Sequence, residues 1–486
     1  MIVMKFGGTS VQDANAIRRV ARIVQGRLKR QPVIVVSAMA GVTNALVRMA
    51  EAAVDHRVED ALRELAEVKL RHVQAAETLV NGNALPGVLA DFEESIASLE
   101  RLLNGIAAVG ELSARSHDAV LAYGEMLSSV LVSAAFRTGG LNSVHLDSRR
   151  LIVTDDSYKA AQPIMEQTEE RLRKAVNPAI REAQVPVMAG FIAATQEGVT
   201  STLGRGGSDY TAAIVGAALS VEAIEIWTDV EGMLTTDPRL CSDAKRIQSI
   251  SFDEAAELAY FGAKVLHPAT LLPAVEKNIP VYVLNSGNVN STGTCIRKEV
   301  PPSRSQFRAI AAKKGSTVIN LRAPRMLFAS GFLRSMFEVL EKHRCSVDLV
   351  STSEVSVSLV VDPSHDVAGI LPELKRMGDV EVESGKAIVC LVGNNIRGRV
   401  GIAAQVFQTL AESGVNIHMI SQGASEINIS VVVDEGDVPK AVNQLHRRFF
   451  PKSATSRSRK KTFVTQPKKK PHSDAAEVSL NAGGAQ

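Results

Sequence analysis

Two glycine-containing segments of the chain carry side chains that could bind and transfer a phosphoryl group. In KFGGTS, Lys5 comes before Gly7 and Gly8, whereas the phosphate loop of the common nucleotide-binding ATPases places its lysine after the glycines. The Lys5 ammonium group could instead neutralise charge on a transferring phosphoryl group, beside a turn that lets backbone approach a ligand. The alternative for so short a motif is a surface lysine before an ordinary strand-to-helix turn.

The second segment, LGRGGSDYTAA, places Ser208 and Asp209 after three glycines and before an apolar helical pattern that begins at Tyr210. Unpaired backbone N–H groups and the positive end of the helix dipole make such a helix start an anion site. A phosphate or a carboxylate could bind there. The structural alternative is that Ser208 or Asp209 serves only as the N-cap of the helix.

Two more polar loops follow apolar segments. SAMAGVTN contains Ser37 and Thr43, and WTDVEGMLTTDPR contains Thr228, Asp229 and Arg239. In an open, mostly parallel α/β sheet, ligands bind at the carboxyl ends of the strands. We therefore expect the chemistry of this chain at the ends of its strands.

The elements that position these loops alternate between strand and helix patterns. MIVMKF and PVIVVSAM are short apolar runs typical of buried strands, and apolar side chains recur at helical spacing in residues 15–28 between them. VPVMAGFIA, VEAIEIWT and IPVYVL are further strand candidates, and the pattern over 43–103 is helical with a break near NGNALPG. The alternation predicts an α/β fold with an open, mostly parallel sheet.

An internal repeat follows a proline-containing linker. The segment from Gly331 matches the segment from Gly401 at an offset of about 70 residues, and each copy has the pattern of a helix, a turn and two strands. Two small α+β modules are predicted, followed by a basic, polar tail too poor in apolar groups to fold. The predicted organisation is a catalytic domain over 1–297, a linker over 298–310, modules over 311–385 and 386–450, and a disordered tail over 451–486.

Composition argues against several classes of protein. The formal net charge is +3 over 486 residues, which implies no polyanion partner for the body of the chain. The four cysteines are far apart and form no CxxC pair, so neither a disulfide framework nor a zinc site is predicted. The sequence shows no export signal and no uninterrupted apolar membrane span. We expect a cytoplasmic protein without a membrane partner.

Taken together, the motifs resemble one family. KFGGTS, SAMAGVTN, YGEMLS, TLGRGGSDYTAA, IWTDVEGMLTTDPR, FGAKVLHPATLLPA and the repeated C-terminal module are similar, in order and spacing, to the aspartate kinases of the lysine-sensitive, single-function type. The resemblance runs from about Met4 to about Phe450. It implies an amino-acid-kinase fold followed by two ferredoxin-like ACT domains. The implied reaction transfers the γ-phosphoryl group of ATP to the side-chain carboxylate of L-aspartate, the first step of lysine, threonine, methionine and diaminopimelate biosynthesis.

The resemblance also implies roles for single residues. Lys5 would stabilise the negative charge during phosphoryl transfer, and Asp209 would orient Lys5 and the phosphoryl group. No general base would be required, because the attacking carboxylate is already ionised. Arg205 would bind the α-carboxylate of aspartate, and Glu125 would accept its ammonium group. Without the resemblance, Glu125 would be interpreted as a solvated helix charge. The implied substrate-binding residues are Thr43, Glu125, Arg205 and Ser208.

On the nucleotide side, the resemblance implies contacts from several loops. They are Lys5, Gly7, Gly8, Ser37, Thr228, Asp229, Leu234, Arg239 and Lys264. Leu234 stands where related enzymes often have an aromatic residue, which weakens stacking on adenine without abolishing binding. ATP implies Mg²⁺ held mainly by phosphate oxygens and waters, and no protein ligand to a metal is predicted.

The repeated modules imply feedback regulation by an amino acid, with L-lysine as the expected effector. In the lysine-sensitive relatives the effector binds between paired modules of two chains, which implies a homodimer or homotetramer. The matching positions are Met326, Phe332, Leu333, Asp348, Thr352, Ser353 and Glu354. The carboxylates of Asp348 and Glu354 could bind a cationic amino acid. Ala329 stands where those relatives typically have a hydroxyl group, so the identity of the effector stays open.

Three alternatives stay open beside this hypothesis. A catalytically silent amino-acid sensor would keep the fold, but the intact set of candidate catalytic and substrate-binding residues speaks against it. A related kinase for glutamate, carbamate or a nucleotide would not suit the pairing of YGE with GRGGSD or the tandem modules. The tail, with Arg459–Lys461 and Lys468–Lys470, could tether the chain to nucleic acid or a membrane. A solvated tail is favoured, because aromatic residues for base stacking are not interleaved with its charges.

Overall fold

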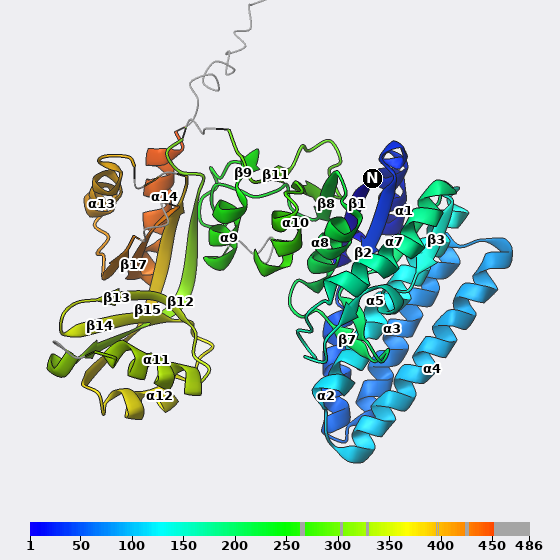
Figure 1. The fold of residues 1–486 in the computed structure, drawn as a ribbon, viewed down its shortest axis with the longest axis horizontal. Coiled ribbons are helices and arrows are strands. Elements are labelled where there is room, and N and C mark those ends of the chain that lie inside the picture. Colours follow the sequence, from blue (N-terminus) through cyan, green and yellow to red (C-terminus); the bar gives the residue numbers. More distant parts are fainter. Residues whose placement is uncertain are drawn as a thin grey trace, which may run out of the picture.

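The computed structural model describes most of the chain. The described residues are 1–262, 268–301, 305–326, 330–394, 396, 398–422 and 427–451. Lys264, Ala329 and the predicted tail from residue 452 onward lie outside them. Figure 1 shows two bodies: a large α/β part built from the N-terminal elements, and a smaller α+β part built from the C-terminal ones. The helix α9 (Phe252–Tyr260) and the short strands β9 (Ser249–Ile250) and β11 (Thr294–Ile296) lie between them.

The large part is organised around an eight-stranded sheet with the order β3-β5-β2-β1-β8-β10-β11-β9. All pairs from β3 to β10 are parallel, as predicted, and only β10 and β11 pair antiparallel. The strands are β1 (Ile2–Phe6), β2 (Pro32–Val36), β3 (Ser143–Leu146), β5 (Val185–Ala189), β8 (Ala223–Thr228), β9 (Ser249–Ile250), β10 (Val281–Asn285) and β11 (Thr294–Ile296).

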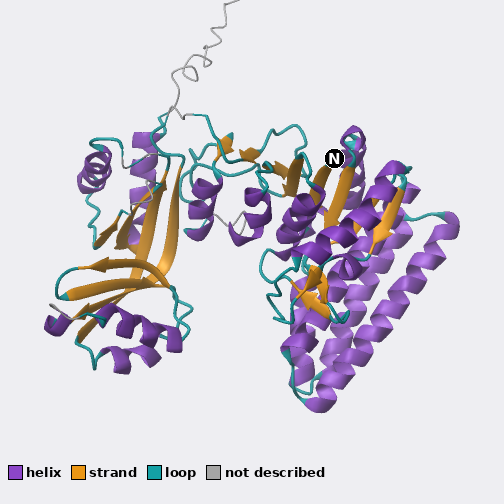
Figure 2. Cartoon of the chain, in the orientation of Figure 1, coloured by secondary structure: helices purple, strands orange, loops and turns teal. Residues whose placement is uncertain are grey.

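Helices cover both faces of this sheet (Figure 2). They are α1 (Ala14–Gln25), α2 (Val42–Val54), α3 (Val58–Leu79), α4 (Leu85–Val109), α5 (Ala114–Thr138), α6 (Ser148–Leu151), α7 (Met165–Arg181), α8 (Gly207–Leu219), α9 (Phe252–Tyr260) and α10 (Leu272–Glu276). The helices predicted over 15–28 and 43–103 are confirmed. The break near NGNALPG is confirmed too, since α3 ends at Leu79 and α4 begins at Leu85.

The side chains of β1 contribute alternately to two hydrophobic clusters, one on each face of the sheet. Met4 and Phe6 belong to a buried cluster with the apolar faces of α1 to α5. Val3 belongs to a second buried cluster with α7 and α8. Successive side chains of a strand point to opposite faces of its sheet, so one apolar strand supports both layers and holds the Lys5 end firmly in place.

Helix α5 is the one helix of the described residues with the length and apolarity of a membrane span. However, 78% of its apolar window is buried inside the chain. Its buried residues include Asp118 and Glu125 as well as apolar side chains. Its apolarity is therefore that of a central core helix, packed between the sheet and helices α2 to α4.

A three-stranded sheet lies beside the large one. It consists of β4 (Val153–Thr154), β6 (Ile192–Thr195) and β7 (Thr200–Thr202), in the order β4-β6-β7. The hydroxyl groups of Thr154 and Ser201 lie 2.7 Å apart inside it. This sheet brings the loop after β7 to the start of α8.

The C-terminal part is one six-stranded antiparallel sheet with the order β13-β14-β12-β15-β17-β16. Its elements are β12 (Ala309–Arg322), α11 (Phe332–Lys342), β13 (Val347–Thr352), β14 (Ser356–Val361), α12 (Val367–Leu374), β15 (Asp379–Val392), α13 (Ile402–Glu412), β16 (Met419–Ser421), β17 (Asn428–Asp434) and α14 (Val438–Phe449). Each repeat therefore contains the predicted helix and strand pair.

The long strands β12 and β15 run through both modules. Ala309–Lys314 pairs with Ala387–Val392 beside β17, whereas Val318–Arg322 pairs with β14 and with Asp379–Glu383. The start of β12 thus lies in the sheet of the second module, and the first module is inserted after it. Two residues of the predicted linker, 309 and 310, belong to this strand. The module boundaries at 311–385 and 386–450 stay predictions.

Candidate active site

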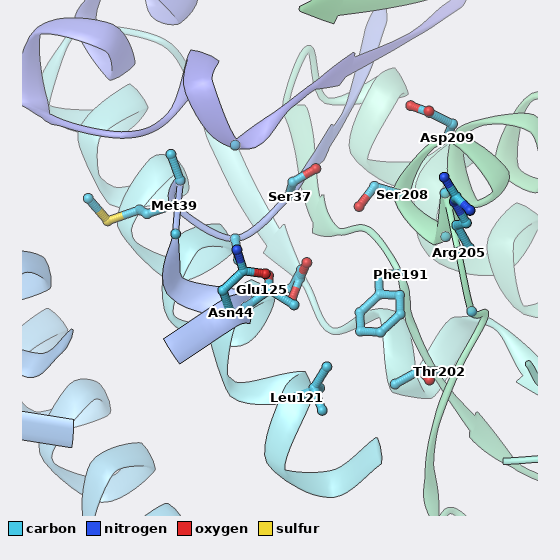
Figure 3. A pocket seen from close by; sticks show the side chains of 18 of the residues that line it. Ser37, Met39, Asn44, Leu121, Glu125, Phe191, Thr202, Arg205, Ser208 and Asp209 are labelled. Atoms are coloured by element: carbon cyan, nitrogen blue, oxygen red, sulfur yellow. The ribbon is translucent and has the colours of Figure 1, made fainter. Parts of the chain in front are cut away.

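A cavity of about 550 Å³ opens at the carboxyl ends of β1 and β2, between α5 and the start of α8. Figure 3 shows Arg205 and Asp209 on its glycine-loop side, and Glu125 and Asn44 across from them. All of the predicted catalytic and substrate-binding residues line it, namely Lys5, Thr43, Glu125, Arg205, Ser208 and Asp209. Gly8 and Ser37, which were predicted to bind the nucleotide, line it as well.

Strand register brings the predicted loops to one edge of the sheet. Phe6 pairs with Val36 of β2 and with Trp227 of β8. The loops that begin at Gly7, Ser37 and Asp229 are therefore neighbours, although nearly 200 residues separate the last two. The backbone N–H of Gly7 donates to the carbonyl oxygen of Trp227 at 3.0 Å.

The centre of the cavity is an ion pair between Lys5 and Asp209. Lys5 Nζ lies 2.7 Å from Asp209 Oδ1, and both side chains are only about a tenth exposed, at 11% and 12%. Asp209 lies in the first turn of α8, where the helix dipole also favours a negative charge. The pair confirms that the two glycine-containing segments meet, and it fixes the Lys5 ammonium group at the cavity.

Neither Ser208 nor Asp209 caps helix α8. The N-cap is Gly206, with φ of +71°, and no side chain makes a cap hydrogen bond there. The structural alternative for this segment is therefore wrong. Because Gly206 adopts a left-handed conformation that other residues rarely adopt, the loop can turn sharply and leave Ser208 and Asp209 pointing to the cavity.

Glu125 is a buried carboxylate in the middle of α5. Its side chain is 4% exposed, so the interpretation as a solvated helix charge is wrong. Burial raises its pKa to about 8, although hydrogen bonds from backbone N–H groups, including that of Ala38, and the charge of Lys5 act in the opposite direction. Its Oε2 has no hydrogen-bond partner among the described residues. An ammonium group in the cavity would supply that partner and the missing positive charge.

Several lining residues were not predicted from the sequence. They are Met39, Asn44, His117, Leu121, Lys159, Phe191 and Thr202, together with small residues of the glycine loops. His117 and Leu121 precede Glu125 by eight and four residues on α5, so they share its helix face. That spacing was a signal available in the sequence. Thr202 opens the motif TLGRGGSDYTAA but had no assigned role, and Lys159 belonged to no motif.

The predicted nucleotide-binding residues are more dispersed. Thr228 ends β8 and Asp229 follows it, at the same sheet edge as Lys5, and the Thr228 hydroxyl donates to Asp229 Oδ1 at 3.1 Å. Arg239 is 85% exposed and paired with Asp237, and Leu234 forms an isolated bridge with Arg246. Neither Leu234 nor Arg239 lines the cavity described above.

The predicted effector residues come from three segments of the first module. Met326 ends a short 3-10 helix (Pro324–Met326), and Phe332 and Leu333 begin α11. Thr352, Ser353 and Glu354 are exposed at the end of β13 and in the turn after it. Asp348 differs, because its side chain is 2% exposed. Lys313 Nζ lies 2.6 Å from Asp348 Oδ2, and the Tyr260 hydroxyl donates to Asp348 Oδ1 at 2.9 Å.

Comparison with known proteins identifies the family of the chain. The model of the amino acid kinase family matches residues 1–285, and a model of the ACT domain matches residues 389–449. Lysine-sensitive aspartokinase 3 of Escherichia coli is 39% identical over 465 residues, which cover 93% of this chain and 99% of that protein. The chloroplastic aspartokinase 1 of Arabidopsis thaliana is 38% identical over 92% of this chain and 80% of that protein.

Two solved structures are similar to this chain in fold as well as in sequence. Aspartokinase III of E. coli with aspartate and ADP, in its R-state, gives a TM-score of 0.80 at 37% identity and covers 93% of this chain and 100% of that one. The same enzyme with lysine and aspartate, in its T-state, gives 0.79 at 37% identity, covering 93% and 99%. The chain therefore belongs to the amino acid kinase family and, within it, to the aspartokinases.

Proposed function

We propose that this chain transfers the γ-phosphoryl group of ATP to the β-carboxylate of L-aspartate, giving ADP and L-4-aspartyl phosphate. The observation that carries the proposal is one cavity in which the Lys5–Asp209 ion pair faces the buried carboxylate of Glu125 and the cation of Arg205. The relatives named above and the E. coli structure with aspartate and ADP support the choice of substrates.

The two ends of aspartate match two parts of the cavity. Glu125, ionised when a cation approaches, accepts the substrate ammonium group, and Arg205 holds the α-carboxylate through its planar guanidinium group. Thr43 and Ser208, which also line the cavity, complete the contacts. The β-carboxylate is then directed toward the Lys5 end of β1.

Phosphoryl transfer needs charge stabilisation and alignment more than proton transfer. A β-carboxylate oxygen forms the new bond to the γ-phosphorus while the bond to the ADP oxygen breaks. Lys5 stabilises the negative charge that shifts during this step, and Asp209 holds the Lys5 ammonium group at 2.7 Å. No general base is needed, because aspartate enters as a carboxylate.

The nucleotide lies, in this proposal, along the edge formed by the glycines after β1 and by Thr228 and Asp229 at the end of β8. Leu234, Arg239 and Lys264 are proposed as more distant contacts. Among the described residues there is no group of three or more His, Cys, Asp or Glu side chains able to hold a metal ion. Mg²⁺ is proposed to enter with ATP, because phosphate oxygens and waters are its preferred ligands.

Feedback regulation is proposed at the first C-terminal module, with L-lysine as the effector. The lysine-sensitive E. coli relative and its structure with lysine support this choice. A homodimer or homotetramer is proposed through the same part of the chain. Leu333 and Phe337, one helical turn apart on α11, are 42% and 40% exposed and offer an apolar stripe for a second copy.

A cytoplasmic location is proposed as well. All four cysteines of the chain are free thiols, as is usual for proteins of a reducing compartment.

The test is ADP formation by the purified chain with L-aspartate, L-glutamate or no acceptor. We expect ADP release that requires L-aspartate, is much slower with L-glutamate and is suppressed by added L-lysine. ADP release with glutamate alone would indicate a related kinase. Lysine binding without aspartate-dependent ADP release would indicate an amino-acid sensor that has kept the fold.

A further inference from the structure

Asp118 is a buried carboxylate to which the chemistry proposed above assigns no task. Its side chain, on α5 two turns before Glu125, is completely buried. Its Oδ2 accepts a hydrogen bond from the backbone N–H of Lys159 at 2.9 Å and another from the backbone N–H of Thr202 at 2.8 Å. Lys159 and Thr202 both line the substrate cavity. A single oxygen atom thus ties two separate wall segments to the helix that carries Glu125.

The Lys159 segment has a conformation that needs such support. Lys159 has φ of +72°, in the left-handed region that residues other than glycine rarely adopt. A residue held there is strained unless its surroundings fix it. The charge-assisted hydrogen bond from its N–H group to Asp118 provides that fixation.

The same segment packs against the loop that carries Arg205. A Cβ atom added to Gly204 would lie 2.9 Å from the carbonyl oxygen of Lys159, so the two backbones are in direct contact. The Ala161 N–H also donates to the carbonyl oxygen of Thr202 at 2.9 Å. A shift of the Lys159 segment would therefore be passed on to the Arg205 loop.

The second oxygen of Asp118 faces another lining residue. Oδ1 lies 3.5 Å from Nδ1 of His117, and neither atom has a hydrogen-bond partner among the described residues. His117 itself lines the cavity. All three neighbours of the Asp118 carboxylate thus belong to the wall of the cavity, on the side where aspartate is proposed to bind.

We propose that Asp118 is a positioning residue for aspartate, an inference that rests on the proposed function. It holds the Lys159 and Thr202 walls, and through Gly204 the Arg205 loop, at a set distance from Glu125. The two residues proposed to bind the ends of the substrate then keep their separation. Thr228 and Asp229, proposed for the nucleotide, lie at the end of β8 and not on the segments that Asp118 holds, so Asp118 acts on aspartate and not on ATP.

The test compares steady-state kinetics of the full chain with those of Asp118→Ala and Asp118→Asn. Asp118→Ala removes the acceptor of both backbone bonds, whereas the amide oxygen of Asp118→Asn can still accept them. We expect Asp118→Ala to raise the KM for aspartate about tenfold or more, as the loss of hydrogen bonds to a charged acceptor implies. The KM for ATP should stay within about twofold, and Asp118→Asn should recover most of the affinity for aspartate.

Asp147→Ala is the matched control, because Asp147 also accepts a backbone bond, from the Arg149 N–H at 3.0 Å, but caps α6 outside the cavity. It should leave both KM values unchanged. If Asp118→Ala does not fold, Asp118→Ser, whose hydroxyl group can reach one donor, should show an intermediate rise in the KM for aspartate.

A merely structural role would give equal effects on the two substrates, or a loss of folded protein with unchanged KM values, and either result overturns the proposal. The proposed function fails separately, if the wild-type chain releases no ADP with aspartate. A fully active wild type together with an unaltered aspartate KM in Asp118→Ala would leave the function intact and refute the role of Asp118.

Discussion

The Tyr260 hydroxyl donates a hydrogen bond of 2.9 Å to Asp348 across 88 positions of the sequence. Tyr260 ends α9 of the α/β part, and Asp348 lies on β13 of the first C-terminal module. Lys313 completes the group, since its ammonium lies 2.6 Å from Asp348 and 5.6 Å from the centre of the Tyr260 ring. An effector cation that binds Asp348 must compete with these two internal partners. The contact therefore links the proposed effector site directly to the α/β part.

Tyr260→Phe should make the chain more sensitive to its effector. Removal of the hydroxyl group frees one oxygen of Asp348, so an added amino acid competes only with Lys313. A net hydrogen-bond contribution of about 1 kcal/mol corresponds to roughly a fivefold lower concentration of L-lysine for half-maximal inhibition. The measurement is ADP release at saturating substrates over a range of lysine concentrations.

Tyr123→Phe is the control for this prediction, because it removes a comparable bond, from the phenol to the Ser98 hydroxyl at 2.9 Å, within the α/β part. It should leave inhibition unchanged. Weaker inhibition in Tyr260→Phe would show that the Tyr260 bond is kept in the inhibited form, contrary to the competition argued here.

The affinity for aspartate should rise with pH because of Glu125. The pKa of this buried carboxyl group is about 8, so below pH 8 it is mostly protonated and offers no charge to the substrate ammonium group. Between pH 6 and pH 7 the apparent affinity should therefore increase by about tenfold, and it should level off near the pKa. Calorimetry in buffers of different ionisation enthalpy should show proton release when aspartate binds.

Glu125→Gln separates this effect from other titrations. It should bind aspartate weakly at every pH and release no proton on binding. A pH-independent affinity in the wild-type chain, with no proton released, would exclude Glu125 as the ammonium acceptor.

The same pKa makes a prediction about stability. Because the pKa of Glu125 in the folded chain lies above its value in the unfolded chain, its contribution to stability is complete at acidic pH and is lost as the pH rises toward about 8. Glu125→Gln has no such group to ionise. In the absence of substrate it should therefore unfold at a higher denaturant concentration than the wild type at pH 8.5, and the difference should shrink at pH 5.

The two glycines of KFGGTS should respond differently to alanine. A Cβ atom at Gly8 would lie 2.9 Å from the carbonyl oxygen of Ala38, so the loops after β1 and β2 would have to separate. At Gly7, with φ of −70°, the nearest atoms would lie at ordinary contact distances of 3.6 and 3.7 Å. Gly8→Ala should cost about 1–3 kcal/mol of stability by overpacking, and Gly7→Ala should cost little. Denaturant unfolding of the two variants checks this, and equal losses would contradict it.

Much of the fold follows from local patterns in the sequence. Apolar runs and helical spacing predict β1, α1 and β2, because each element there buries one continuous face. The repeat predicts the helix and strand pair of each module. It does not predict that β12 extends through both modules, since self-similarity detects repeated units and not the pairing partners of a shared strand.

Some residues of the site could likewise be predicted from the sequence, and others could not. Lys5, Asp209 and Glu125 belong to motifs with chemistry of their own, so they could be proposed from residue type and spacing. Asp118 could not, because its task depends on two backbone N–H groups from distant segments, which only the folded chain brings together. The contact between Asp348 and Tyr260 could not be predicted either, because the sequence shows only an acidic residue on a predicted strand.

The most direct test of the central claim is to trap the acyl phosphate with hydroxylamine during turnover of ATP and L-aspartate. The wild-type chain should form aspartyl hydroxamate, and Lys5→Met should form it at least about 100-fold more slowly, in line with the loss of one charge-stabilising group. Lys29→Met, at an exposed lysine of the same domain, should match the wild type. Absence of hydroxamate from the wild type, or an equal rate in Lys5→Met, would contradict the account.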